Sequence, residues 1–180
     1  MKVLAKWSVE DYHRIISAGI FKERRVELLD GEIVEMSPEG PLHRYTNDAL
    51  AEYLRTLLGS SAKVFEAHPI TLANSEPEPD IAIVKAPRSL YRSRHPYPED
   101  IYWLIEISDS TLSYDLDEKK KVYARSQIEE YWVVDITAKK LTIFRQPLGE
   151  EYQSKTEYTT GKISPVTFPD LEIDIDEIFN

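Results

Sequence analysis

Two carboxylates stand at the ends of short apolar runs that favour β-strands. Asp80 opens the run Asp80–Val84, and Glu106 lies near the end of the run Ile101–Ile107. A carboxylate in an apolar central strand is costly to bury unless another group compensates it. If the strands are neighbours, the two carboxylates can converge, and such a pair of oxygen ligands suits Mg²⁺ or Mn²⁺. A metal held there would acidify a bound water and stabilise charge on a reacting phosphoryl group, which is the chemistry of phosphodiester hydrolysis.

Each carboxylate taken alone has an ordinary structural explanation. A Pro-Asp pair such as Pro79-Asp80 often begins a strand, and a glutamate at a strand end, such as Glu106, can simply reach solvent. The combination of the two, in these contexts, is what indicates a metal site.

A third group of polar residues follows the second strand. The segment from Asp115 to Ser126 predicts a helix, in which Asp115, Lys119 and Tyr123 are four residues apart and share one face. Spacing alone favours an exposed Asp–Lys pair on a solvated helix, which contributes only a few tenths of a kcal/mol.

The rest of the chain predicts the elements that would position these side chains. The expected elements are a helix over 8–17, a hairpin in RVELLDGEIVEM around Asp30-Gly31, a helix over 42–58, a strand over 63–72 broken at Pro69, an irregular loop over 85–100, strands over 131–135, 140–145 and 151–158, and a polar acidic tail. Trp103, Trp132 and Val134 are expected in the core. The alternation of helices and strands predicts an α/β fold, with a mixed central sheet flanked by helices and with a hairpin and strands added at the two ends. We expect residues 1–180 to form a single domain.

Composition excludes several classes of protein. Hydrophobic content of 42% excludes a largely disordered chain, and the absence of cysteine excludes disulfides and thiolate metal sites. The N-terminus lacks the pattern of a signal peptide, and no apolar run is long enough to span a bilayer, so we expect a cytoplasmic protein. The net charge of −10 argues against binding of nucleic acid through bulk electrostatics. A local basic cluster does exist, formed by Arg88, Arg92, Arg94 and His95.

Four stretches of the chain together resemble one known family. They are VELLDGEIVEMSP at 26–38 with His43 just beyond, EPDIAIV at 78–84, IEISDSTLSYDLDEKKKVYA at 105–124, and EEYWVVD at 129–135. In this order the sequence resembles the Uma2 family of the PD-(D/E)xK nuclease superfamily. The resemblance spans most of the chain and implies a restriction-endonuclease-like core.

The resemblance also implies roles for individual residues. Asp80 matches the aspartate of the PD motif and Glu106 the acid of (D/E)xK, so both are implied as catalytic residues and metal ligands. The motif's lysine is replaced by Ser108, and the resemblance points instead to Lys119 on the following helix. Consecutive residues point about 100° apart around a helix, so we expect the next two lysines, at 120 and 121, to be solvated.

Two further residues match family positions, His43 and Glu27. His43 could contact a phosphate or assist proton transfer, or form a local hydrogen bond at the helix start. Glu27 could be a metal or supporting ligand, or face solvent on the hairpin.

The function implied is metal-dependent hydrolysis of DNA by an endonuclease that uses Mg²⁺ or Mn²⁺. Two alternatives stay open, which are an inactive interaction module that keeps the fold and a nuclease acting on RNA. The acidic net charge and Ser108 favour the inactive module. No sequence motif for reading bases is evident. By analogy with the superfamily we expect a homodimer and no membrane partner.

Overall fold

The computed structural model describes residues 4–180, and its centre is a mixed six-stranded sheet. The strand order is β3-β4-β5-β6-β7-β8, and only the central pair β5 and β6 is parallel. The strands are β3 (Ala62–Glu66), β4 (Ile81–Lys85), β5 (Ile101–Ser108), β6 (Glu130–Asp135), β7 (Lys140–Leu148) and β8 (Glu151–Tyr158). The predicted α/β fold with a mixed central sheet is therefore confirmed.

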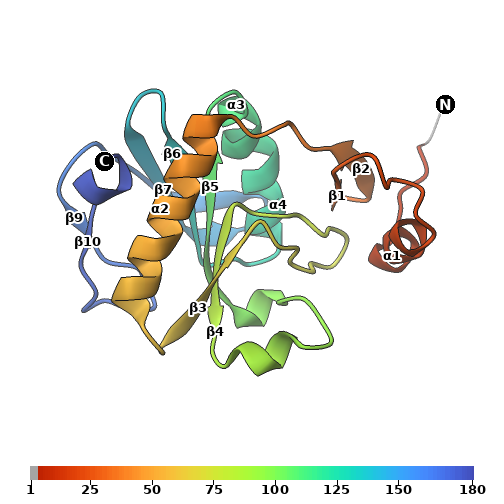
Figure 1. Cartoon of the computed structure of the whole chain (residues 1–180), viewed down its shortest axis with the longest axis horizontal. Coiled ribbons are helices and arrows are strands. Elements are labelled where there is room, and N and C mark those ends of the chain that lie inside the picture. The colour runs from red at the N-terminus through yellow and green to blue at the C-terminus, as the bar shows by residue number, and fades with distance from the viewer. Residues whose placement is uncertain (1–3) are drawn as a thin grey trace.

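Helices cover both faces of this sheet (Figure 1). On one face lies the long helix α2 (Pro41–Leu58), which ends at Gly59 with a positive φ of 53°. On the other face lies a composite helix made of α3 (Leu112–Tyr114), the π-helical turn η3 (Asp115–Lys119) and α4 (Lys120–Arg125). The crossover between the parallel strands β5 and β6 runs through this composite helix, as a parallel pair requires.

The alternation of side chains along the strands gives the sheet two apolar faces. Against α2 pack Ile81, Ile83, Trp103, Ile105 and Trp132. The opposite face is covered by the composite helix and forms a second core cluster, whose members include Ala82, Leu104, Tyr123, Tyr131 and Phe144. Trp103, Trp132 and Val134 are completely buried, which confirms their expected place in the core.

The N-terminal residues form a small unit beside this body (Figure 1). It contains α1 (Val9–Ser17) and a hairpin of β1 (Val26–Leu29) and β2 (Glu32–Glu35). Ser8 caps α1 in a reciprocal capping box with Asp11, and the hairpin turns at Asp30-Gly31, both with positive φ, as the sequence predicts. An apolar cluster that includes Tyr12, Val26 and Leu28 holds the helix to the hairpin.

Two parts of the sequence-based prediction are wrong. The strand expected over 63–72 ends at Glu66, because Ala67 takes a positive φ of 46° and turns the chain away. The tail expected to be merely polar contributes β9 (Lys162–Ile163), β10 (Ile173–Asp174) and the 3-10 turn η4 (Asp176–Ile178). Its isoleucines are spaced among acids, and four of them are buried against the α2 face, namely Ile163, Ile173, Ile175 and Ile178.

The loop expected over 85–100 is confirmed as irregular, and it contains two short 3-10 turns, η1 (Arg88–Tyr91) and η2 (Pro98–Asp100). Within residues 4–180, no helix has both the length and the apolar character needed to cross a bilayer.

Candidate active site

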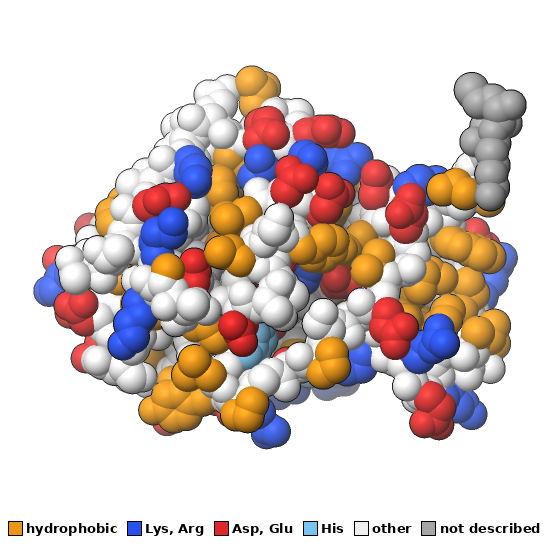
Figure 2. Space-filling view, turned by 90° about the horizontal axis from the view of Figure 1, so that it is seen from above, with side chains coloured by type: hydrophobic (Ala, Val, Ile, Leu, Met, Phe, Trp, Pro, Cys, Tyr) orange, Lys and Arg blue, Asp and Glu red, His pale blue; other side chains and the backbone are white. Residues whose placement is uncertain are grey.

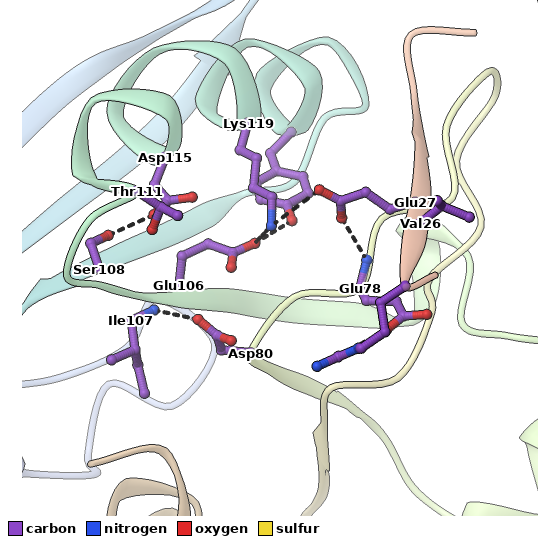
Figure 3. Close-up of polar contacts among 12 residues, drawn as sticks. Val26, Glu27, Glu78, Asp80, Glu106, Ile107, Ser108, Thr111, Asp115 and Lys119 are labelled. Atoms are coloured by element: carbon purple, nitrogen blue, oxygen red, sulfur yellow. Dashed lines mark hydrogen bonds and ion pairs between the residues drawn. The ribbon is translucent and has the colours of Figure 1, made fainter. Parts of the chain in front are cut away.

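Asp80 and Glu106 lie on adjacent antiparallel strands and face the same side of the sheet. Ile81 of β4 is paired with Ile105 of β5, so the next residues outward, Asp80 and Glu106, stand opposite each other. The backbone N–H of Ile107 donates a hydrogen bond of 2.7 Å to Asp80 Oδ2, which fixes that carboxylate at the strand end (Figure 3). The arrangement expected from the two apolar runs is the one observed.

Lys119 reaches this pair from the helix on the same face. Its Nζ lies 3.1 Å from Glu106 Oε1 and 3.7 Å from Glu27 Oε1, and the residue is only 6% exposed (Figure 3). The hydroxyl of Tyr123, one turn later, donates to the same Glu106 oxygen at 2.6 Å. The prediction from spacing of an exposed Asp–Lys pair is therefore wrong, because Asp115, Lys119 and Tyr123 all face inward.

The prediction that one of the three consecutive lysines faces the cleft and the other two are solvated is confirmed only in part. Lys119 alone points into the site, while Lys121 pairs with Asp117 on the helix surface. The expectation that Lys120 is solvated is wrong, because its side chain is only 13% exposed and pairs with Glu151 of β8. The neighbouring strand β8 covers this part of the helix, which the helix sequence alone does not reveal.

Glu27 enters the site from the N-terminal hairpin. Its neighbours Val26 and Leu28 pack toward α1, so alternation sends Glu27 to the opposite side, toward the sheet. There it is 3% exposed, and its Oε2 accepts a hydrogen bond of 3.1 Å from the backbone N–H of Glu78. A solvent-facing role for Glu27 is excluded, and its carboxylate joins the backbone bridge between Leu28 and Glu76 in tying the hairpin to the segment before β4.

His43 comes from the first turn of α2, whose N-cap is Gly40. Its Nε2 lies 3.2 Å from Asp80 Oδ2, a residue far away in sequence, so the imidazole is not merely bonded at its own helix start. Its Nδ1 is buried and has no partner among the described residues. The five residues proposed from the sequence are thus brought together around one cleft.

Ser108 and Asp115 form a link that the sequence prediction missed. The Ser108 and Thr111 hydroxyls each donate to Asp115 Oδ2 at 2.7 Å, and all three residues lie on the turn from β5 into the composite helix (Figure 3). Ser108 has the same strand parity as Glu106, so it occupies the face where a strand lysine would stand. The spacing of four residues between Thr111 and Asp115 at the helix start is the local signal that could have identified part of this link.

Burial dominates the electrostatics of the cleft. It raises the pKa of Glu106 well above its usual value, and the Lys119 ammonium opposes that shift while Asp80 adds to it. Burial also raises the pKa values of Glu27 and Asp115, again opposed by Lys119. For Lys119 burial alone would lower the pKa, but the carboxylates of Glu106 and Glu27 outweigh it and raise the pKa. One buried cation therefore offsets part of the burial cost of several acids.

For His43 two influences oppose each other. Burial alone would lower the pKa of the imidazole, but the hydrogen bond and the charge of Asp80 outweigh it and raise the pKa.

These groups line a cavity of about 360 Å³. Its walls come from the cleft residues, from the segment after β2 and from the turn after β5. Arg25 stands at its edge and is paired with Glu39 at 3.0 Å and with Glu78 at 3.4 Å. Figure 2 views the molecule from the end where α3 and the start of α2 lie, and acidic and basic side chains are interspersed on that face.

The donor set fits a hard divalent cation. Asp80 and Glu106 each use one carboxylate oxygen for the contacts above, and within residues 4–180 neither Asp80 Oδ1 nor Glu106 Oε2 has a hydrogen bond or ion pair. No group of three or more acidic or histidine side chains in the described chain is arranged to hold a metal ion. Two carboxylates with solvent completing the shell is the set that Mg²⁺ accepts and Zn²⁺ disfavours.

Comparison with known proteins gives a family and a fold. The family model of Uma2, described as "Putative restriction endonuclease", matches residues 9–176. A solved structure from Anabaena variabilis, described as a "putative nuclease belonging to DUF820", superposes with a TM-score of 0.69 at 16% identity. That match covers 87% of this chain and 90% of the other, and at this identity it supports the fold alone. No curated protein matches the sequence.

Proposed function

The chain belongs to the Uma2 family of restriction-endonuclease-like proteins, and on that premise we propose that it is a metal-dependent nuclease that hydrolyses phosphodiester bonds in DNA. The observation that carries the proposal is the cluster of Asp80, Glu106 and Lys119. Two carboxylates on one sheet face keep an oxygen each without a partner in the described chain, beside a buried ammonium group. Burying this many charges is costly, and a purely structural role would not require it.

Asp80 and Glu106 are the residues that would hold Mg²⁺ or Mn²⁺. When bound, the ion supplies Lewis acidity toward a phosphodiester oxygen. The backbone N–H of Ile107 and the Tyr123 hydroxyl hold the two carboxylates in place, each through the oxygen that is not left free. This preorganisation lowers the reorganisation cost of the reaction.

Lys119 and His43 are the groups of the chain that can act on the substrate. The Lys119 ammonium, kept protonated by Glu106 and Glu27, places a positive charge where negative charge develops on a phosphate. His43 lies on the other side of Asp80, where its imidazole can exchange a proton with the leaving group or contact a phosphate oxygen. Glu27 touches Lys119 and positions it, and within residues 4–180 it forms no hydrogen bond with Asp80.

The presence of Ser108 in place of the motif lysine no longer favours an inactive module. Ser108 has a structural partner in Asp115, and the ammonium group is supplied by Lys119 from the helix. The long lysine side chain reaches Glu106 from the neighbouring element, so loss of the strand lysine does not remove the positive charge from the cleft.

The proposal is tested by a cleavage assay. Supercoiled plasmid and a single-stranded oligonucleotide are incubated with Mg²⁺, with Mn²⁺ and with chelator, using the wild type and Asp80→Ala. We expect cleavage that needs the metal and is lost in Asp80→Ala, with Asp48→Ala as a control because Asp48 is an exposed acid on α2 paired only with Arg44 in the described chain. Equal cleavage by the wild type and Asp80→Ala, or none by either with any metal or substrate, would refute the proposal.

A further inference from the structure

A second hollow of about 570 Å³ opens near the cleft, and its lining is basic and aromatic. Its principal side chains are Phe65, His68, Arg88, Tyr91, Arg92 and Arg94, and we call it the basic groove. No aspartate or glutamate is among the described residues that line it. In a chain of net charge −10, a hollow lined by cations without acids is a marked local reversal of sign.

The positive charge of this basic groove is largely uncompensated. Arg88 and Arg92 are exposed and form no ion pair with any carboxylate of the described chain, whereas most other arginines are paired. Lys63, in the adjoining hollow that shares Phe65, His68 and Arg88, likewise has no ion pair within residues 4–180. Unpaired guanidinium groups are the preferred donors for phosphate, which they bind in a bidentate manner.

Arg94 differs, because it organises the groove rather than offering free charge. It is paired with Asp100, and its guanidinium lies 5.6 Å from the Tyr91 ring centroid and 4.5 Å from that of Tyr97. Phe65 meets Tyr91 edge to face at 5.3 Å. The groove therefore combines cations with fixed aromatic rings, which is the composition of surfaces that track a strand of nucleic acid.

The basic groove is connected to the active site along β3. Alternation places Lys63 and Phe65 of β3 on the sheet face that carries Asp80, and just beyond the strand the Ala67 N–H donates to the Asp80 carbonyl at 3.0 Å. Ala67 lines the cleft and the next residue, His68, lines the groove. From Lys63 to Glu66, the last residue of β3, is about 10 Å at the rise of a strand.

We propose that the basic groove binds the substrate strand next to the scissile phosphate, as an extended single strand of nucleic acid. Arg88, Arg92 and Lys63 would neutralise successive phosphates, and the rings of Phe65 and Tyr91 would border its bases. The inference rests on the proposed nuclease function, and it explains how an acidic protein engages a polyanion through one confined surface. It also assigns a role to the loop between β4 and β5 that the catalytic cluster does not use.

The test measures binding in the absence of cleavage. A fluorescein-labelled thymidine oligonucleotide of about 20 nucleotides is titrated in chelator, with anisotropy as the readout, against the wild type and the double variant R88E/R92E. We expect the variant to bind at least about tenfold more weakly, and its slope of log affinity against log salt to fall by about 1.4, since two phosphate contacts are lost. The control K22E/K139E makes the same change of charge at two exposed lysines outside the groove, and it should bind as the wild type does.

Further arms separate this inference from the proposed function. Asp80→Ala should keep oligonucleotide binding, and R88E/R92E should keep Mn²⁺-dependent hydrolysis of bis(p-nitrophenyl) phosphate, an ester too small to reach the groove. Wild-type binding by R88E/R92E would overturn the groove and leave the catalytic proposal standing. Groove-dependent binding without hydrolysis of any substrate would overturn the catalytic proposal alone. Displacement of the oligonucleotide by an equal concentration of poly-glutamate would show an acidic-peptide site and overturn the groove's assignment to nucleic acid.

Discussion

The acidic cleft and the basic groove lie on one sheet face but differ in how their charges are accommodated. In the cleft, Glu27, Glu106 and Asp115 are buried and share the single ammonium of Lys119, so their charge is compensated in part inside the protein. In the groove, Arg88 and Arg92 stay in solvent without partners in the described chain. A buried charge depends on its internal partner for stability, while an exposed charge can be lost at little cost to folding. Mutations in the cleft should therefore change stability and chemistry, and mutations in the groove should change binding.

The largest expected effect concerns folding and is confined to the cleft. Lys119→Ala leaves Glu106 and Glu27 buried without their counter-ion, and should lower the free energy of unfolding by about 3 to 5 kcal/mol in chemical denaturation. Arg92→Ala, in the groove, should change it by about 0.5 kcal/mol or less. The double variant Lys119→Ala/Glu106→Gln should recover part of the loss, because one buried charge is removed with its partner. Equal stability of Lys119→Ala and the wild type would mean that the cleft does not depend on this pair.

The second-largest expected effect is on the rate of cleavage when Lys119 is replaced. In Lys119→Ala, assayed at a temperature where circular dichroism shows it folded, the cleavage rate should fall by about 10²-fold, the usual scale for a positioned electrostatic or proton-transfer group. Lys121→Ala is the matched control, because its amine is on the helix surface with Asp117 and its removal should leave the rate unchanged. A larger loss in Lys121→Ala than in Lys119→Ala would show that the active lysine is wrongly assigned.

Metal binding in the cleft should stabilise the protein, and this stabilisation should not depend on the arginines of the basic groove. Mn²⁺ at about 100 times its dissociation constant should add about 2.7 kcal/mol to the stability of the wild type and raise its melting temperature. The same rise is expected in R88E/R92E, whose carboxylates are intact, and no rise in Asp80→Ala. Calorimetric titration gives the dissociation constant independently. If Mn²⁺ leaves the melting temperature of the wild type unchanged, the metal dependence of the proposed function is contradicted.

The smallest effect is a pH dependence of the metal-free protein. Burial raises the pKa of Glu106 in the folded state above its usual 4.5, so the folded protein binds its proton more tightly than the unfolded chain. Stability from this group is therefore fully present below about pH 4.5 and is lost as the pH rises through the folded pKa. The stability of the wild type relative to Glu106→Gln, measured by chemical denaturation across this range, should fall as the pH rises. A gap that changes in the opposite direction would show that Lys119 more than compensates for burial.

Much of the fold could be predicted because its signals are local. The capping box at Ser8 and Asp11, the turn at Asp30-Gly31 and the apolar run of β5 all formed as expected. The prediction was wrong where the outcome depends on distant partners. A polar tail is expected from composition, but its isoleucines pack on the α2 face, and no local pattern reveals that a face elsewhere is left uncovered.

The sequence by itself determined which residues carry charge and which face of each element they occupy. The apolar runs placed Asp80 and Glu106 at strand ends, and helical spacing placed Asp115, Lys119 and Tyr123 on one side, whereas the pairing that sets Asp80 opposite Glu106 came from the structure. Only the tertiary structure decided that this helix face is buried on β5, that Glu27 arrives from a separate hairpin, and that Lys120 is covered by β8. The reason is physical: periodicity fixes direction relative to an element's own axis, while burial and ion pairing depend on what another part of the chain brings within a few ångströms.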